Sequence, residues 1–167
     1  IKKKKNILSK DTIRGISFTK NDAKLTLLGV KDKPGVAASI FKPLYENSIN
    51  VDMVVQNISS GGKETDLTFT IKLEDLNKTR NLIESNKSIK FKNLIINKNV
   101  SKVSIVGVGM VTTPGVTFRM FKALAKKKIN IEVISTSEIK ISVLVNKKNL
   151  KKSVEILHQE FKLNNTL

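Results

Sequence analysis

The chain has 167 residues, of which 40% are hydrophobic and 27% charged, an ordinary globular composition that argues against wholesale disorder. It contains no cysteine, which excludes disulfides, thiolate metal sites and a cysteine nucleophile. No apolar run approaches the roughly 18 residues of a membrane-spanning helix. The length allows one ordinary domain or two small ones.

The net charge of +17 has two interpretations. Basic chains are typical of proteins that bind nucleic acid or an anionic membrane surface. Only three of the 31 basic residues are arginine, however, and arginine is the side chain that phosphate and base recognition favours. Lysine, asparagine and isoleucine, whose codons are rich in A and T, make up 63 of the 167 residues. We therefore favour compositional drift, and we expect no nucleic acid and no membrane as partners.

In chain order, the apolar pattern predicts short strands and helices. A β-rich segment at 13–18 precedes a strand at 24–30 and the turn residues Pro34-Gly35. Apolar residues then recur at helical spacing from Val36 to Leu44. The segments that follow predict a strand within 49–58, a strand at 66–71, a helix over 73–83 and a strand at 91–96. The order from residue 24 onward is βαββαβ.

An internal repeat divides the chain. Residues 34–54 recur as residues 114–134, with eight of 21 positions identical, including the Pro-Gly pair. A β-rich run that ends in Gly-Val precedes each pair, at 25–30 and at 103–108. The second copy continues to a helix at 150–161, but its last strand is poorly supported, so the segment at 13–18 could supply that strand.

Motifs for catalysis are scarce. The single histidine, His158, lies on the last predicted helix and has no partner at zinc-ligand spacing. A Gly107-Val-Gly109 sequence follows a strand, but Thr112 stands where a dinucleotide-binding loop needs glycine or alanine. We therefore predict no catalytic residue, no metal site and no cofactor in this segment.

The repeated Pro-Gly pair suggests a binding site. It brings backbone close to a helix N-terminus, where unpaired N–H groups favour a carboxylate. Polar residues that could accept an ammonium group begin the next strand of each copy: Asn50, Asp52, Asn130 and Glu132. Together these groups suit a free α-amino acid. The same residues are also ordinary turn signals, and from the residues alone that second interpretation is favoured.

Longer segments resemble the tandem ACT modules of aspartate kinases. Residues 27–38, 49–58 and 65–70 resemble the first ACT module, and residues 103–110, 114–116, 129–131 and 134–143 resemble the second. The resemblance covers about residues 13–162 and implies an α+β fold of two ferredoxin-like βαββαβ modules. Their antiparallel sheets would carry helices on one face, and the first module would be inserted into the second.

The resemblance also implies a function. Aspartate kinase uses ATP to phosphorylate the β-carboxylate of aspartate on the way to lysine, threonine and methionine. Its Lys-Phe-Gly-Gly catalytic motif is absent here, so the chain resembles the C-terminal regulatory part or a separate regulatory subunit. ATP and Mg would belong to the kinase domain. We expect a cytoplasmic homodimer, paired through ACT modules, that binds lysine or threonine and inhibits the kinase.

The implied organisation is a linker from the kinase domain at 1–11 and a first ACT domain at 21–97. Residues 12–20 and 98–163 would form the second ACT domain, and 164–167 a tail.

Two effector sites are implied. The first combines the Pro-Gly turn with the following strand and is closed by the facing module, and it comprises Asp32, Lys33, Pro34, Gly35, Val36, Ala37, Asn50, Val51, Asp52, Gln56, Asn130 and Ile131. The second comprises Met110, Thr113, Gly115, Val116, Glu132, Ser137 and Glu138. We assign the backbone N–H groups of residues 35–37 to the carboxylate, Asp52 to the ammonium group and Gln56 to the side chain. Relatives often have a basic residue after the Gly-Met pair where this chain has Val111-Thr112, so use of the second site stays open.

Two rival functions remain. A free-standing ACT pair could control another enzyme. A βαββαβ sheet is also the shape of RNA-recognition modules, but the expected third strands contain one aromatic residue, Phe69, and no RNA-binding signature.

Overall fold

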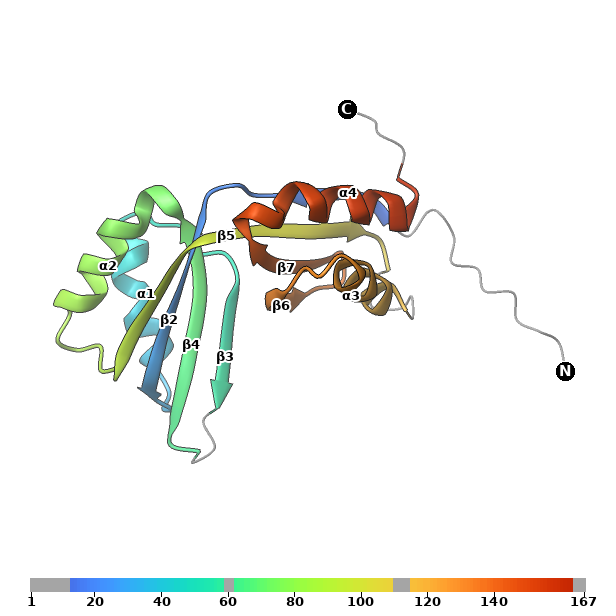
Figure 1. Cartoon of the computed structure of the whole chain (residues 1–167). Coiled ribbons are helices and arrows are strands. Elements are labelled where there is room, and N and C mark those ends of the chain that lie inside the picture. Colours follow the sequence, from blue (N-terminus) through green and yellow to red (C-terminus); the bar gives the residue numbers. More distant parts are fainter. Residues whose placement is uncertain (1–12, 59–61, 110–114, 164–167) are drawn as a thin grey trace, which may run out of the picture. The chain divides into compact units, whose positions relative to one another are not determined.

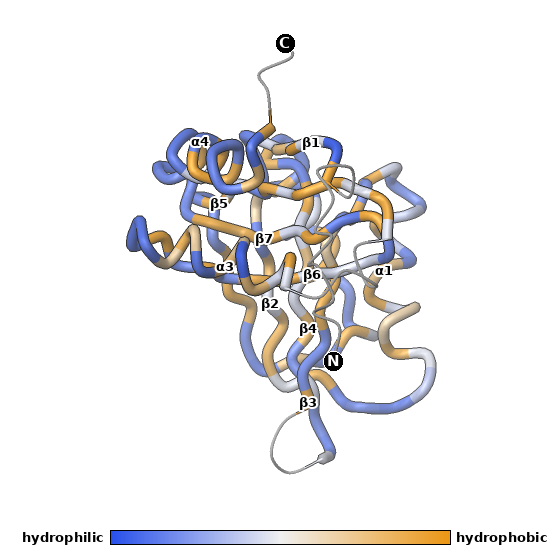
Figure 2. The backbone as a smooth tube through the Cα atoms, turned by 90° about the vertical axis from the view of Figure 1, so that its right-hand side faces the viewer, coloured by the Kyte–Doolittle hydropathy of each residue, from blue (hydrophilic) through white to orange (hydrophobic). Residues whose placement is uncertain are grey.

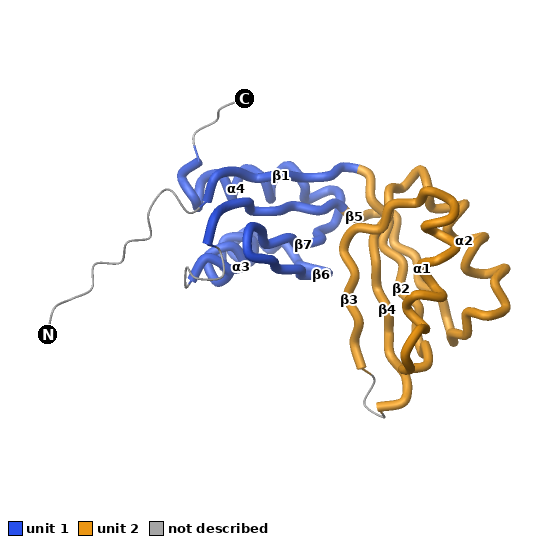
Figure 3. Tube along the Cα trace, turned by 180° about the vertical axis from the view of Figure 1, so that it is seen from behind, with its two compact units in different colours: residues 1–20, 101–167 blue, residues 21–100 orange. Residues whose placement is uncertain are grey.

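The computed structural model describes residues 13–58, 62–109 and 115–163. The predicted linker at 1–11 and the tail at 164–167 lie outside these residues. The chain divides into two compact units, coloured separately in Figure 3. We call residues 21–100 the inserted unit and residues 1–20 with 101–167 the split unit.

The inserted unit has the predicted βαββαβ order (Figure 1). Its elements are β2 (Asp22–Lys31), α1 (Val36–Glu46), β3 (Val54–Ile58), β4 (Glu64–Lys72), a 3-10 turn (Leu73–Asp75), α2 (Leu76–Ser85) and the first part of β5 (Asn93–Gly107). The strands form an antiparallel sheet in the order β3-β4-β2-β5. Helices α1 and α2 share one core with the apolar face of this sheet, and Leu25, Phe69, Ile40 and Ile83 are fully buried in it.

The split unit repeats this arrangement with a strand borrowed from the start of the chain. Its elements are β1 (Ile13–Phe18), the second part of β5, α3 (Val116–Lys126), β6 (Ile131–Thr136), β7 (Lys140–Asn146), a 3-10 turn (Lys147–Asn149) and α4 (Leu150–Phe161). β1 pairs antiparallel with β5, so the sheet order is β1-β5-β7-β6. The predicted fold is therefore confirmed, including the insertion of the first module into the second.

The helices of the split unit pack through one apolar face each. Met120 and Leu124 of α3 and Leu157 of α4 have no solvent exposure, and they belong to the same core cluster as Ile105 and Val143 of the sheet. Figure 2 shows hydrophilic and hydrophobic residues interleaved along α4, as this one-sided burial requires. None of the described helices is long and apolar enough to cross a membrane.

Strand β5 differs from the prediction. The sequence predicted separate strands at 91–96 and 103–108, with the polar residues Asn97-Lys98-Asn99 between them. The structure has one strand of 15 residues instead. The polar run stays extended because Asn97 pairs with Lys24 and Val100 with Asp22, and because Val100 and Ser101 are fully buried. One strand thus serves both sheets.

Candidate functional site

A pocket of about 510 Å³ lies at the end of β2 in the inserted unit. The turn after β2, the first turn of α1 and the facing parts of β3 and β4 form its walls. It is lined by Val30, Lys31, Asp32, Lys33, Pro34, Gly35, Val36, Ala37, Ile40, Gln56, Thr65 and Leu67. Its volume is in the range of sites that bind small molecules.

The N-terminus of α1 forms one wall of this pocket. Gly35 is the N-cap residue and adopts a left-handed conformation with φ 87°, which glycine tolerates without strain. Having no side chain, Gly35 cannot cap the helix, and the first backbone bond of the helix is Ser39 N–H to Gly35 C=O at 3.0 Å. The N–H groups of Ala37 and Ala38 therefore lack the side-chain cap that serine or aspartate would supply. An anionic group in the pocket can accept from them.

A β-bulge in β2 gives the pocket its shape. The pairing of β2 with β4 shifts between Leu27 and Val30, and Gly29 in this bulge has φ +65°. The extra residue reverses the alternation, so Val30 faces the helices and is 1% exposed. Asp32, two residues further on, donates its N–H to the carbonyl of Lys63 at 3.1 Å, which holds the turn over the pocket.

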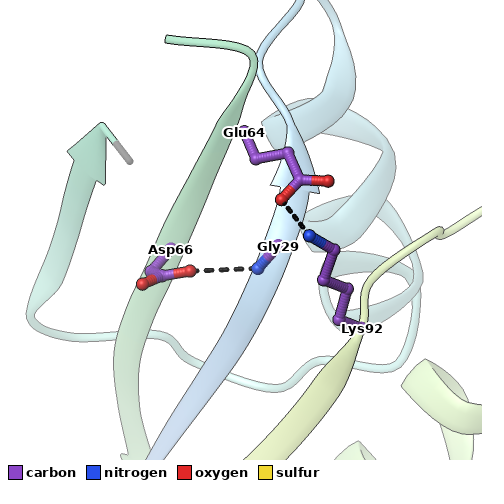
Figure 4. A network of polar contacts seen from close by, with 4 residues as sticks. All are labelled: Gly29, Glu64, Asp66 and Lys92. Carbon is purple, nitrogen blue, oxygen red and sulfur yellow. Dashed lines mark hydrogen bonds and ion pairs between the residues drawn. The ribbon is translucent and has the colours of Figure 1, made fainter. Parts of the chain in front are cut away.

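Polar contacts hold the bulge in place (Figure 4). The backbone N–H of Gly29 donates to Oδ1 of Asp66 at 3.0 Å, and Nζ of Lys92 contacts Oε2 of Glu64. Figure 4 shows Gly29 between these two acidic residues of β4 and the Lys92 side chain. A Cβ atom at Gly29 would lie 2.6 Å from Cδ of Lys92, so this position has room only for glycine unless Lys92 moves.

The structure brings together part of the first predicted site. Residues 32–37 and Gln56 line the pocket. Asn50, Val51 and Asp52 do not, because Asp52 N–H donates to the carbonyl of Thr70, near the opposite end of β4. Thr70 is five residue steps along β4 from Thr65 in the pocket wall, a distance of roughly 16 Å. Within one unit, Asp52 and the N-terminus of α1 therefore do not reach the same small ligand.

The remaining predicted residues lie in the split unit. Met110 and Thr113 are outside the described residues. Gly115 begins α3 with φ 90°, as Gly35 begins α1, and Val116 is buried. Ser137 closes the turn between β6 and β7, where its N–H donates to the carbonyl of Lys140 at 2.8 Å. Glu132 and Ile131 are on β6, exposed Asn130 precedes it, and exposed Glu138 lies in the same turn as Ser137.

Sequence reasoning missed five residues of the pocket: Val30, Lys31, Ile40, Thr65 and Leu67. The internal repeat could have predicted the β-bulge that shapes the pocket. We aligned Gly29-Val30 with Gly107-Val108, whereas the 80-residue offset of the Pro-Gly pair matches Gly29 with Gly109. Both of these glycines have positive φ, +65° and +67°, so the constant offset was the better guide.

The polar side chains of the pocket are basic, acidic, amide and hydroxyl groups. Lys31 and Lys33 flank the uncapped helix end, Asp32 supplies one carboxylate, and Gln56 supplies an exposed amide. The Thr65 hydroxyl is already used, because it donates to the carbonyl of Asn57 at 2.7 Å. Among the described residues, no group of three or more histidine or acidic side chains could hold a metal ion.

Comparison with known proteins defines the class. The profile of the ACT domain family matches residues 25–86 and 103–161, one match in each unit. The aspartokinase of Pseudomonas aeruginosa is 47% identical over 152 residues, which are 90% of this chain and 37% of that protein. The aspartokinase of Helicobacter pylori is 46% identical over 151 residues, with the same coverage. The chain thus spans little more than a third of the length of these curated relatives.

Two solved structures match along almost their whole length. The regulatory subunit of aspartate kinase from Thermus thermophilus, in its ligand-free form, has a TM-score of 0.83 and 34% identity. A structure of aspartokinase alpha and beta subunits gives a TM-score of 0.82 and 40% identity. In each case the match covers 90% of this chain and 99% of the other. The fold and the pocket define a pair of ACT domains. The chain belongs to the ACT domain family, among the regulatory regions and subunits of aspartokinases.

Proposed function

We propose that the pocket at the start of α1 binds an end-product amino acid and thereby mediates feedback inhibition of aspartate phosphorylation. The observation that carries this proposal is the uncapped N-terminus of α1 in the wall of a pocket of about 510 Å³. In this proposal the carboxylate of the amino acid accepts from the N–H group of Ala37, which lines the pocket, and from that of Ala38, the next residue of the helix. This changes our assignment to residues 35–37, because the Val36 N–H already donates to the carbonyl of Lys33 at 3.3 Å.

The ammonium group needs a nearby acceptor. Asp32 is the acidic residue that lines the pocket, whereas Asp52 lies near Thr70. We therefore transfer the ammonium role from Asp52 to Asp32. Asn50, Asp52, Asn130 and Ile131 keep a role only if a second copy of the chain brings them to the ligand, as the proposed homodimer of ACT modules would allow.

The charge of the pocket bears on which amino acid binds. Lys31 and Lys33 outnumber the single carboxylate of Asp32, and two cations disfavour a third in the ligand side chain. Gln56 supplies an amide that can exchange hydrogen bonds with a hydroxyl. Threonine is therefore our first candidate for this pocket, with lysine second.

Inhibition would arise from a shift of population. The effector binds one arrangement of the ACT pair more tightly and moves an attached or associated kinase domain, where ATP and Mg bind, toward its inactive state. The shift cannot exceed the difference in affinity between the two states, for which about 1–3 kcal/mol is typical.

Calorimetric titration of the whole chain with L-threonine and L-lysine tests the proposal. We expect saturable binding of threonine and none of threonine methyl ester, which lacks the carboxylate. Gln56→Ala should weaken binding about 2- to 10-fold, the range for one hydrogen bond. Asn57→Ala is the matched control, since the neighbouring side chain on β3 points to the other face of the sheet.

Two results would oppose the proposal. Equal binding of the methyl ester would remove the carboxylate from the interaction. An Asp52→Ala variant that loses binding, while Asp32→Asn keeps it, would return the ammonium role to Asp52.

A further inference from the structure

The positive charge is unevenly divided between the two units. The inserted unit has 12 basic and 9 acidic residues, a net charge of +3. In the split unit, without residues 1–12, which have no counterpart in the inserted unit, there are 14 basic and 4 acidic residues, a net charge of +10. Drift in codon composition acts on the whole gene, so it does not explain a difference between two copies of the same fold.

Seven lysines of the split unit gather at one end of its helical layer. Three follow one another at the end of α3 and four surround the start of α4: Lys126, Lys127, Lys128, Lys147, Lys148, Lys151 and Lys152. All seven are exposed. The two groups meet, because Nζ of Lys152 donates to the carbonyl of Lys127 at 3.0 Å and α3 packs against α4. We call these residues the lysine end.

The inserted unit provides an internal control for this surface. There, Nζ of Lys78 donates to the carbonyl of Asn47 at 3.2 Å, the counterpart of the bond between Lys152 and Lys127. This bond therefore belongs to the shared fold. Around it the inserted unit has different residues at the places of the lysines: Glu46, Asn47, Ser48, Leu73, Glu74 and Asn77. The fold does not require lysine at the other six positions.

The four lysines around the start of α4 carry a cost in stability. No acidic residue lies in the first turn of α4, and a helix N-terminus disfavours positive charge. Glu155 pairs with Lys151 at 3.9 Å, but this pair is well exposed and screens the cluster only weakly. Like charges at close range repel one another, so a bound polyanion would relieve the repulsion.

The composition of this surface favours a phosphate backbone over an acidic protein. Protein interfaces are enriched in aromatic residues, methionine and arginine and depleted in lysine. The segments 126–128 and 147–152 contain no aromatic residue, no arginine and a single apolar residue, Leu150. Lysines alone suffice for binding a nucleic acid without sequence preference, because counterion release supplies the free energy.

We propose that the lysine end of the split unit binds the phosphate backbone of nucleic acid without sequence preference. This inference replaces our expectation of no nucleic-acid partner. It uses a helical end rather than the open sheet face that RNA-recognition modules use. It is independent of the proposed effector pocket, which lies in the inserted unit.

Fluorescence anisotropy with a labelled duplex DNA of random sequence tests the proposal on the whole chain over a series of salt concentrations. The patch variant copies the inserted unit and carries Lys126→Glu, Lys148→Glu and Lys151→Asn. The control variant makes the same change of charge on exposed residues of the inserted unit, with Lys87→Glu, Lys98→Glu and Lys42→Asn. Circular dichroism verifies that both variants are folded. If the patch variant is not folded, a variant with glutamine at the same three lysine positions is used in its place.

We expect the wild-type affinity to fall steeply with salt. The patch variant should bind at least about tenfold more weakly and reduce the salt slope by about three, one for each lysine lost. The control variant should stay within about threefold. Absence of wild-type binding, equal losses in both variants, or equally tight binding of poly-glutamate would overturn the proposal.

Discussion

The two units share one order of helices and strands and differ in their surfaces. α1 and α3 have 11 residues each, and both begin at a left-handed glycine, with φ 87° at Gly35 and 90° at Gly115. Each has a lysine from the second helix of its unit bonded to a carbonyl just past its C-terminus. The surface around that bond carries acidic residues in one unit and lysines in the other. Core packing and turn geometry require similar residues in both units, whereas the residues at exposed positions differ between them.

The largest expected loss of stability comes from truncating a buried leucine, and it tests whether the cores of the two units contribute equally to the free energy of unfolding. Leu44 in α1 and Leu124 in α3 occupy matching positions, and both have no solvent exposure. Leu44→Ala and Leu124→Ala should each lower the free energy of unfolding by about 2–5 kcal/mol, because each leaves a cavity. Urea denaturation measures both. The exposed neighbour Tyr45 is the control, and Tyr45→Ala should stay within about 0.5 kcal/mol. A severe loss for only one of the leucines would break the equivalence.

The next largest loss of stability is expected at one of two register shifts in the sheets and not at the other. The β2–β4 pairing shifts near Gly29 and the β1–β5 pairing near Gly15. Gly29→Ala should lower the free energy of unfolding by about 1–3 kcal/mol, because φ is +65° and the new Cβ would meet Lys92. Gly15→Ala should be nearly neutral, since a Cβ added there would meet nothing within 4 Å beyond its chain neighbours. Thermal unfolding compares them, and equal losses would contradict the special role of Gly29.

A third, smaller loss of stability is expected at a partly buried ion pair in the split unit. Nε of Arg119 donates to Oε1 of Glu160 at 2.9 Å, Nη2 donates to the Glu160 carbonyl at 2.7 Å, and the guanidinium lies 4.7 Å from the centre of the Phe161 ring. Ser39 stands at the matching place in α1. Arg119→Met should lower the free energy of unfolding by about 1–2 kcal/mol, because the pair is about two-thirds buried.

The matched control for Arg119 is the exposed ion pair between Arg80 and Glu84, one helical turn apart in α2. Arg80→Met should change the free energy of unfolding by no more than about 0.5 kcal/mol. If both methionine variants lost the same amount, burial would not be the reason for the difference.

The smallest expected loss of stability concerns Lys78 and Lys152, which make the same hydrogen bond in the two units but differ in their expected contribution to DNA binding. Lys78→Ala and Lys152→Ala each remove one exposed hydrogen bond to a helix end and should cost at most about 0.5 kcal/mol. Only Lys152→Ala should weaken DNA binding, by about threefold, and anisotropy measures it. A matching loss with Lys78→Ala would attribute the binding to net charge alone.

Much of the fold could be predicted from the sequence. The repeat, the helical stripes and the turn residues predicted the βαββαβ order, because this order depends on local periodicity and spacing. The insertion was implied by the resemblance to tandem ACT modules, and the weak last strand of the second copy agreed with it. The length of β5 could not be predicted, because the run 97–99 is polar and is kept in the strand by the pairing of Asn97 with Lys24 and of Val100 with Asp22. Such tertiary pairing outweighs local preference.

The site was only partly predictable, for a similar reason. The Pro-Gly turn was singled out from the residues and Gln56 from the resemblance, and both line the pocket. Asp52 was grouped with them because it is near in sequence, yet the direction of β3 and β4 carries it to the other end of the sheet. Thr65 and Lys31 were missed because only the pairing of β4 with β2 brings them together.

A backbone-amide NMR titration of the whole chain with L-threonine tests most directly whether the start of α1 binds the effector. We expect the largest saturable shifts on the amides of Ala37 and Ala38, with smaller shifts at Asp32 and at the Gln56 side chain. Saturable shifts confined to other residues, with the amides of Ala37 and Ala38 unchanged, would contradict the claim that the uncapped end of α1 binds the effector carboxylate.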